Sequence, residues 1–141
     1  VGTGFSMAAK LAHPNKEVVC LYGDGSFGMT AFDMETAQRF GAPYLAIVGN
    51  NSAMNQIRYG QISKYGSQRG GVGNKLGDVD FSLFGKMIGG YGEEVREASQ
   101  IQPALLRARE AIAKTGKCAV VNVWVDPNEY APGTKAQTMY K

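Results

Sequence analysis

Cysteine, histidine and long apolar segments are scarce in this sequence. Its 141 residues include two cysteines and one histidine, which form neither a C-x-x-C motif nor a Cys/His metal pattern. No apolar stretch approaches the roughly 20 residues that span a bilayer, so we expect no membrane segment. Both Cys20 and Cys118 lie inside apolar runs, and we interpret them as reduced core thiols of a cytoplasmic protein.

Clustered charge is also missing. The formal net charge is +3, from 15 basic and 12 acidic residues. The basic residues are spread along the chain, whereas a nucleic-acid-binding protein normally presents a dense basic face. We therefore expect neither nucleic acid nor membrane as a partner. The sequence starts with VGTGF and shows no signal-peptide pattern, and we expect it to be a piece of a longer polypeptide or of a split protein.

Apolar runs alternate with helix-like segments, which predicts an α/β domain. The first run is apolar on both faces, as in an open, mostly parallel sheet with helices on both faces. A glycine-rich stretch with six glycines, residues 60–77, is predicted to be a long loop. Predicted strands cover residues 17–22, 44–48, 93–95 and 119–125, and predicted helices cover 4–12, 31–40, 80–88 and 103–114. The expected core positions are Val18, Val19, Leu21, Ile47, Val48, Val121, Val123 and Trp124.

Polar residues follow two of the predicted strands. The first strand ends in Gly23-Asp24-Gly25, and the next one ends in Asn50-Asn51. A crossover helix between parallel strands brings both ends to one edge of the sheet, where α/β proteins bind ligands. One carboxylate, one amide and nearby carbonyls are hard oxygen ligands, which suit Mg²⁺ when phosphate oxygens complete the set. The pair therefore predicts a metal shared with a diphosphate.

These motifs also have two other interpretations. Asp-Gly and Asn-Asn are also ordinary turn sequences, and singly each favours a turn. Gly23, Gly25 and Gly28 spell G-x-G-x-x-G, the dinucleotide fingerprint. The acidic ribose ligand expected about 20 residues later is missing, and Asp24 would put negative charge against a dinucleotide pyrophosphate. A diphosphate with a bridging cation fits both motifs better.

The motif pair resembles a known signature. Gly23-Asp24-Gly25, followed after 24 residues by Asn50-Asn51, is similar to the GDG…NN motif of thiamine-diphosphate-dependent enzymes. The likeness extends from VGTGFSMAAKLAHP through GKMIGGYGEEV to VNVWVDP, and the most similar branch is the acetolactate-synthase-like group with its 2-hydroxyacyl-CoA lyase relatives. It implies that residues 1–126 form an N-terminally truncated pyrophosphate-binding domain, and that 127–141 form a tail, a candidate active-site lid.

The resemblance also implies roles for individual residues. The side chains of Asp24 and Asn51 and the carbonyl of Ala53 would hold Mg²⁺, and Asn55 or Gln56 could orient substrate. The implied cofactor-binding residues are Gly23, Asp24, Gly25, Ser26, Asn51, Ala53 and Met54, where Gly25 and Ser26 provide backbone donors to the diphosphate. The glutamate that activates the cofactor would belong to a pyrimidine-binding domain of the same or a partner chain, so this chain alone would be catalytically incomplete. The resemblance also implies that the full enzyme is a homodimer or homotetramer.

The implied activity is that of a carbon–carbon lyase or ligase. Our specific hypothesis is cleavage of a 2-hydroxyacyl-CoA to a carbonyl compound and formyl-CoA. Four cations in or beside the glycine-rich stretch are either contacts for CoA phosphates or part of a solvated loop: Arg58, Lys64, Arg69 and Lys75. The alternatives are an acetolactate-type carboligase, a 2-keto acid decarboxylase and a non-catalytic nucleotide-binding module. Related oxalyl-CoA decarboxylases tend to read GDS, so the substrate stays open.

Overall fold

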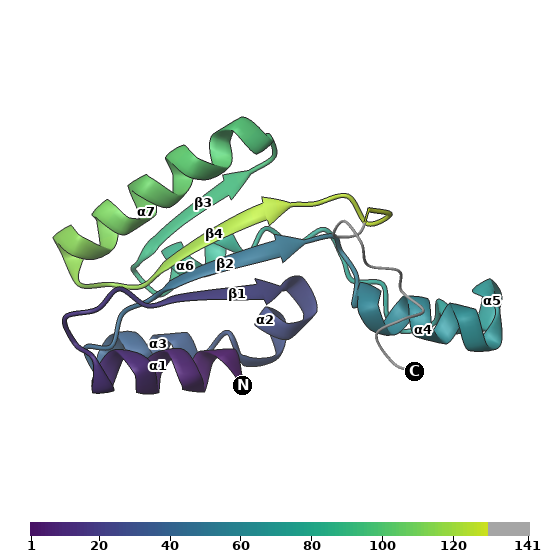
Figure 1. Cartoon of the computed structure of the whole chain (residues 1–141), viewed down its shortest axis with the longest axis horizontal. Helices are drawn as coiled ribbons and strands as arrows, with labels where there is room; N and C mark the ends of the chain where they lie inside the picture. The colour runs from purple at the N-terminus through teal and green to yellow at the C-terminus, as the bar shows by residue number, and fades with distance from the viewer. Residues whose placement is uncertain (130–141) are drawn as a thin grey trace.

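The computed structural model describes residues 1–129, which form one four-stranded sheet with helices on both faces (Figure 1). None of the helices in this part of the chain is long and apolar enough to cross a membrane. Most of the predicted tail, residues 130–141, lies outside the described residues. The elements are α1 (Gly2–Ala12), β1 (Val19–Gly23), α2 (Asp24–Thr30), α3 (Asp33–Arg39), β2 (Leu45–Asn50), α4 (Asn55–Tyr65), α5 (Ser67–Gly70), α6 (Ser82–Met87), β3 (Tyr91–Val95), the 3₁₀ helix η1 (Ala98–Gln100), α7 (Ile101–Thr115) and β4 (Ala119–Trp124).

All neighbouring strands of the sheet are parallel, in the order β1-β2-β4-β3. Gly23 at the end of β1 pairs with Gly49, and Asn50 at the end of β2 pairs with Trp124 at the end of β4. The carboxyl ends of these three strands therefore meet at one edge, which is the usual ligand-binding edge of such sheets. The predicted α/β class, with an open parallel sheet and helices on both faces, is confirmed.

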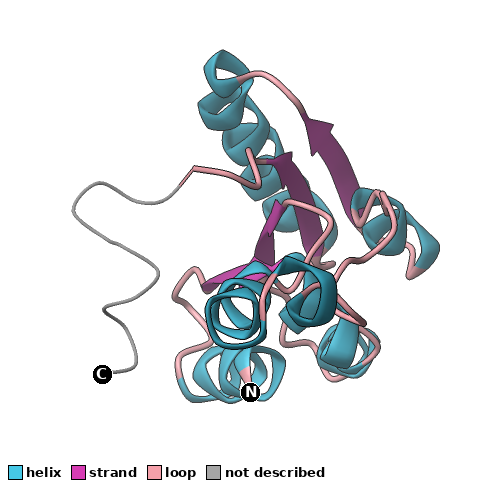
Figure 2. Cartoon of the chain, turned by 90° about the vertical axis from the view of Figure 1, so that its right-hand side faces the viewer, coloured by secondary structure: helices cyan, strands magenta, loops and turns pink. Residues whose placement is uncertain are grey.

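Two apolar cores lie on opposite faces of the sheet. On one face α1, α2, α3 and α6 surround the buried side chains of Phe27, Met34 and Tyr44. On the other face α7 packs Ala104 and Ala108 against the sheet. Figure 2 shows these layers from the side on which β1, β2 and β4 end. α4 and α5 lie beyond that end of the sheet rather than on either face (Figure 1).

The core prediction holds for the predicted valines of the central strands β2 and β4 and fails for β1. Val48, Val121 and Val123 are buried, whereas the side chains of Val19 and Leu21 are 53% and 76% exposed. β1 is an edge strand of the described sheet, and α7 packs against β2, β3 and β4. The prediction of burial on both faces is therefore wrong for β1, because no described element covers its second face.

Trp124 was predicted to be a packing anchor in the core, and this is wrong. It is only half-buried, at the last position of β4. Its indole Nε1 donates a hydrogen bond of 2.6 Å to Oε1 of Glu94, and the side chain lines a cavity at the sheet edge. An amphipathic side chain at a strand end satisfies its polar N–H near solvent, which a fully buried position would make difficult.

The helix predicted over residues 31–40 is confirmed as α3, and a separate short helix that was not predicted, α2, precedes it. Thr30-Ala31-Phe32-Asp33 matches the S/T-x-x-D/E capping pattern, but α3 has no side-chain cap. The Thr30 hydroxyl lies 3.1 Å from the Thr3 hydroxyl in α1. The Thr30 hydroxyl therefore contacts α1 instead of capping α3, as the local pattern would predict.

The prediction of a long loop over residues 60–77 is wrong for its first part. α4 continues to Tyr65, and α5 follows directly. The two helices pack closely at Gly70, where a Cβ atom would lie 2.4 Å from the backbone nitrogen of Ile62. Gly66, with φ of +78°, makes the turn between them. The glycines in this stretch therefore serve close packing and chain reversal rather than irregular structure.

Both cysteines are free thiols, and Cys118 is fully buried. Burial raises the pKa of the Cys118 thiol to about 11. We expect iodoacetamide at pH 8 to alkylate Cys118 at least about 100-fold more slowly in the native protein than in urea, because few thiolates form and access is blocked. Mass spectrometry of the modified peptides measures both rates, and similar rates would contradict the buried position.

The raised thiol pKa also has a consequence for stability. The unfolded thiol loses its proton near pH 9, whereas the folded one keeps it to about pH 11. Between these values the unfolded state binds fewer protons, so the free energy of unfolding falls as the pH rises.

Candidate functional site

Asp24 connects the ends of β1 and β2. It is the first residue of α2, and its side chain is 3% exposed. Its carboxylate accepts hydrogen bonds from the backbone N–H groups of Gly25 at 2.7 Å, Asn51 at 3.1 Å and Ala53 at 3.0 Å. The structure therefore brings together Asp24 and Asn51, which are 27 positions apart, at the sheet edge that the sequence indicated.

The two asparagines of the pair have different surroundings. Asn50 is fully buried; its amide nitrogen donates to the Val79 carbonyl at 2.7 Å and to Oδ1 of Asn122 at 3.0 Å. Its Oδ1 accepts the N–H of Ser52 at 3.1 Å. The Oδ1 atom of Asn51, in contrast, is buried and has no hydrogen-bond partner among the described residues. Asn50 thus holds the loop, and Asn51 has an oxygen available for a ligand.

Ser52 turns the chain between the two predicted metal ligands Asn51 and Ala53. Its φ of +56° lies in the left-handed region, which is uncommon for a residue other than glycine. Its hydroxyl donates to Oδ1 of Asp78 at 2.6 Å, and its carbonyl accepts the N–H of Leu76 at 2.7 Å. These contacts stabilise the strained turn, and they come from a segment in which sequence reasoning found no functional residue other than Lys75.

A hollow of about 330 Å³ lies between the two motifs. Gly25 forms part of its wall, and a Cβ atom there would lie 2.7 Å from Cγ of Met54, so only glycine lets these segments approach so closely. The Gly25 N–H donates to Asp24, and the Ser26 hydroxyl donates to the Gly23 carbonyl at 3.0 Å. The predicted cofactor-binding and substrate-orienting residues all line this hollow: Gly23, Asp24, Gly25, Ser26, Asn51, Ala53, Met54, Asn55 and Gln56.

The two predicted substrate-orienting residues begin α4. The Asn55 amide nitrogen donates to the Pro127 carbonyl at 2.7 Å, which ties α4 to the chain after β4. Its Oδ1 atom is buried and has no hydrogen-bond partner in the described residues. Gln56 is exposed on the rim of the hollow. Asn55 therefore presents a held side chain with one acceptor unused.

The oxygen atoms at this site fit a hard divalent cation. Residues 1–129 contain no group of three His, Cys, Asp or Glu side chains that could hold a metal by themselves. Asp24 has acceptor capacity beyond its backbone hydrogen bonds, and the Asn51 Oδ1 atom is buried without a partner. A cation here would need a diphosphate to complete its ligands, and the adjoining hollow has room for one.

Sequence reasoning missed the residues that hold the site in place. Asn122 lies in β4, 72 positions from its partner Asn50. Asp78 follows the glycine-rich stretch, 26 positions from Ser52. Asn74 is buried and donates to the Gly70 carbonyl and to Gln61, which fixes the segment after α5. Only the polarity of Asn122 within an apolar strand was a visible signal in the sequence.

Known proteins resemble this chain over nearly its whole length. Residues 1–123 match the family model described as "Thiamine pyrophosphate enzyme, C-terminal TPP binding domain". "2-hydroxyacyl-CoA lyase 2" of Mus musculus is 31% identical over 135 residues, which cover 95% of this chain and 21% of that protein. "Probable acetolactate synthase" of Mycobacterium bovis is 33% identical over 131 residues, which cover 93% of this chain and 23% of that protein.

The chain spans about a fifth of the length of these curated relatives. The two relatives come from the branch that the sequence motifs indicated, so the predicted resemblance is confirmed. The matched region includes both motifs and the whole sheet up to Val123. This chain therefore belongs to the thiamine pyrophosphate enzyme family, and its residues 1–123 correspond to the C-terminal cofactor-binding domain of that family.

Proposed function

We propose that this chain is the diphosphate- and Mg²⁺-binding part of a thiamine-diphosphate-dependent enzyme that cleaves or forms carbon–carbon bonds. The observation that carries the proposal is the buried Asp24 carboxylate, which accepts hydrogen bonds from the backbone of the loop that contains Asn51. On this loop the Asn51 Oδ1 atom is buried and has no hydrogen-bond partner among the described residues. Asp24, Asn51 and the Ala53 carbonyl hold the metal in this proposal. The backbone N–H groups of Gly25 and Ser26 bind the diphosphate, with Gly25 exchanging its hydrogen bond to Asp24 for one to the cofactor.

The chain's own residues position the cofactor rather than react with it. When bound, thiamine diphosphate supplies a carbanion nucleophile and an electron sink. Met54 packs against the Gly25 backbone and limits the space beside it. Asn55, held by Pro127, is the residue we assign to orienting substrate through its unpaired Oδ1. No described carboxylate is assigned to cofactor activation. The glutamate that activates the cofactor therefore comes, in this proposal, from a pyrimidine-binding domain in the same or a partner chain.

A 2-hydroxyacyl-CoA is our first choice of substrate, with a carbonyl compound and formyl-CoA as products. A mouse relative is named 2-hydroxyacyl-CoA lyase 2. Arg58 and Lys75 line a cavity beside the site, where they are available for phosphates. The second candidate is an acetolactate-type carboligase, which the mycobacterial relative favours. The enzyme is proposed to assemble as a homodimer or homotetramer. Because both cysteines are free thiols, we place it in a reducing compartment such as the cytoplasm.

The cofactor is tested on the complete protein that contains this sequence, isolated under native conditions. Acid release, followed by oxidation to fluorescent thiochrome, should give about one thiamine diphosphate per copy of this domain, with about one Mg²⁺ by elemental analysis. If neither is present, and neither is taken up when both are supplied in excess, the site does not bind the cofactor and a non-catalytic module becomes the better proposal.

The substrate is tested by turnover. The holoenzyme is given a 2-hydroxyacyl-CoA or pyruvate at equal concentration, and formyl-CoA and acetolactate are measured by mass spectrometry. We expect formyl-CoA from the first substrate and at least about tenfold slower turnover of pyruvate. Acetolactate as the main product would overturn the lyase assignment in favour of the carboligase.

A further inference from the structure

A second cavity, larger than the cofactor hollow, lies beside it. Its volume is about 570 Å³, and its walls come from the end of β4, the residue after β3, α4 and the segment that follows α5. We name it the cation cavity after three of its lining residues, Arg58, Lys75 and Arg96. Asn51 and Ala53 line both this cavity and the cofactor hollow, so the two spaces share a wall.

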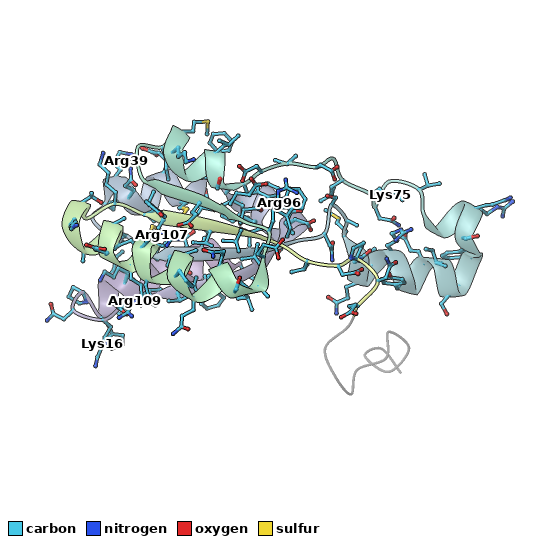
Figure 3. All side chains as sticks on the ribbon, turned by 90° about the horizontal axis from the view of Figure 1, so that it is seen from above. Lys16, Arg39, Lys75, Arg96, Arg107 and Arg109 are labelled. Atoms are coloured by element: carbon cyan, nitrogen blue, oxygen red, sulfur yellow. The ribbon has the colours of Figure 1, made fainter. Side chains whose placement is uncertain are left out.

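The charge of the cation cavity is positive. Asp78 is the one carboxylate among the described residues that line it, and it already accepts a hydrogen bond from Ser52 at 2.6 Å. Arg96 pairs with Glu94 at 2.6 Å, whereas the Lys75 side chain has no hydrogen bond or ion pair with any of residues 1–129. Figure 3 shows Arg96 near the sheet and Lys75 on the segment that runs from α5 back towards the sheet. An anion entering from solvent therefore meets an excess of cations.

Arg58 gives the most direct sign of a ligand. Its Nε atom is buried and makes no hydrogen bond with the described residues. Leaving a buried donor unpaired costs about 1–3 kcal/mol, and more when the group is charged. A guanidinium group pairs well with phosphate, since its N–H donors match the phosphate oxygens. Arg58 lines the cation cavity, where its guanidinium group can pair with a bound phosphate.

A flat surface lies next to these cations. The Arg96 guanidinium carbon is 4.8 Å from the centre of the Trp124 ring, and the Trp124 N–H is fixed by its hydrogen bond to Glu94. The Arg96 side chain remains 66% exposed, so one face of the guanidinium is open. A guanidinium group over an indole ring can take a further aromatic ring, such as a nucleobase.

We propose that the cation cavity binds a phosphate-bearing nucleotide group, with its phosphates on Arg58 and Lys75 and its base on the Arg96–Trp124 stack. A phosphate ion alone would fill little of a space of about 570 Å³, which is within the usual size range of sites for larger ligands. The nucleotide is either the end of a CoA thioester substrate, which rests on the proposed function, or a free nucleotide. The structure thus separates the four cations of the sequence hypothesis, because Lys64 and Arg69 do not line the cavity.

The test uses the complete holoenzyme and adenosine 3′,5′-bisphosphate, which carries a base and phosphates but no thioester. Its dissociation constant is measured by calorimetry for the wild type, Lys75→Ala and Arg58→Ala. We expect each variant to raise the constant about tenfold or more. Lys64→Ala and Arg69→Ala are matched controls, which should change it less than twofold. Lys75 is exposed, so Lys75→Ala keeps the test valid even if Arg58→Ala folds poorly.

The outcomes separate this inference from the proposed function. Competition between the bisphosphate and an acyl-CoA substrate, with the Michaelis constant raised in Lys75→Ala, supports the substrate as source. If the wild type binds the bisphosphate tightly, Lys75→Ala weakens this binding, and no acyl-CoA is turned over, the ligand is a free nucleotide. That result overturns the proposed CoA substrate but not the nucleotide site. No binding of the bisphosphate by the wild type, or equal binding by wild type and Lys75→Ala, overturns the cation cavity as a nucleotide site whatever the enzyme's activity.

Discussion

Asp24→Asn is expected to lower the activity of the complete enzyme by at least about 100-fold and to weaken thiamine diphosphate binding at fixed Mg²⁺. Residues that only support a metal ligand commonly contribute 10- to 100-fold to metal affinity or activity, and Asp24 is the one proposed ligand with a charge. Asparagine keeps the shape but removes that charge. It also presents an N–H₂ group to backbone donors at Gly25, Asn51 or Ala53, which now donate to the carboxylate.

The loss of a hydrogen bond could also destabilise the fold, so the experiment separates the two effects. Cofactor binding is measured by thiochrome content across a titration of thiamine diphosphate, and folding by thermal unfolding. Asp33→Asn is the matched control, because Asp33 is an exposed carboxylate at the start of α3. We expect Asp33→Asn to bind cofactor like the wild type. Wild-type cofactor affinity in Asp24→Asn, even with a lower unfolding temperature, would limit Asp24 to a structural role.

The position of Asp24 and Asn51 could be predicted from the sequence because it follows from topology. Two consecutive parallel strands must end at the same edge, and both motifs lie at strand ends. The residues that support them could not be predicted in this way. Asn122 and Asp78 reach the site from segments whose arrangement depends on the whole fold, 72 and 26 positions from the residues they contact.

The errors in secondary structure also have physical causes. Sequence periodicity reveals a helix by the apolar face that it buries, but α4 has no buried residue, so residues 60–65 gave no such signal. At Thr30 a local capping pattern lost to a contact with Thr3 in another helix. β1 is apolar on both faces, yet Leu21 is exposed, because no described element packs on that side. Each error arises where tertiary contacts, or their absence, override a local pattern.

Gly92→Ala is expected to destabilise the domain by about 3 kcal/mol or more, at the upper end of the usual cost of overpacking. Gly92 lies in β3, and a Cβ atom there would be 1.9 Å from the carbonyl oxygen of Ser82, which begins α6. Ser82 is itself fully buried. The obstacle is backbone rather than a flexible side chain, so α6 would have to move away from the sheet to accept one methyl group.

Gly60→Ala is the matched control, because the same chemical change should have the opposite sign there. Gly60 lies inside α4, with no atom within 4 Å of an added Cβ, and alanine stabilises a helix interior by roughly 0.5–1 kcal/mol relative to glycine. Thermal unfolding and hydrogen exchange of the β3 and α4 peptides in the complete protein measure both effects. If Gly92→Ala kept wild-type protection in β3, the close packing of α6 on the sheet would be disproved. Opposite shifts would show that the glycines of this chain serve packing in one place and merely lower helix stability in another.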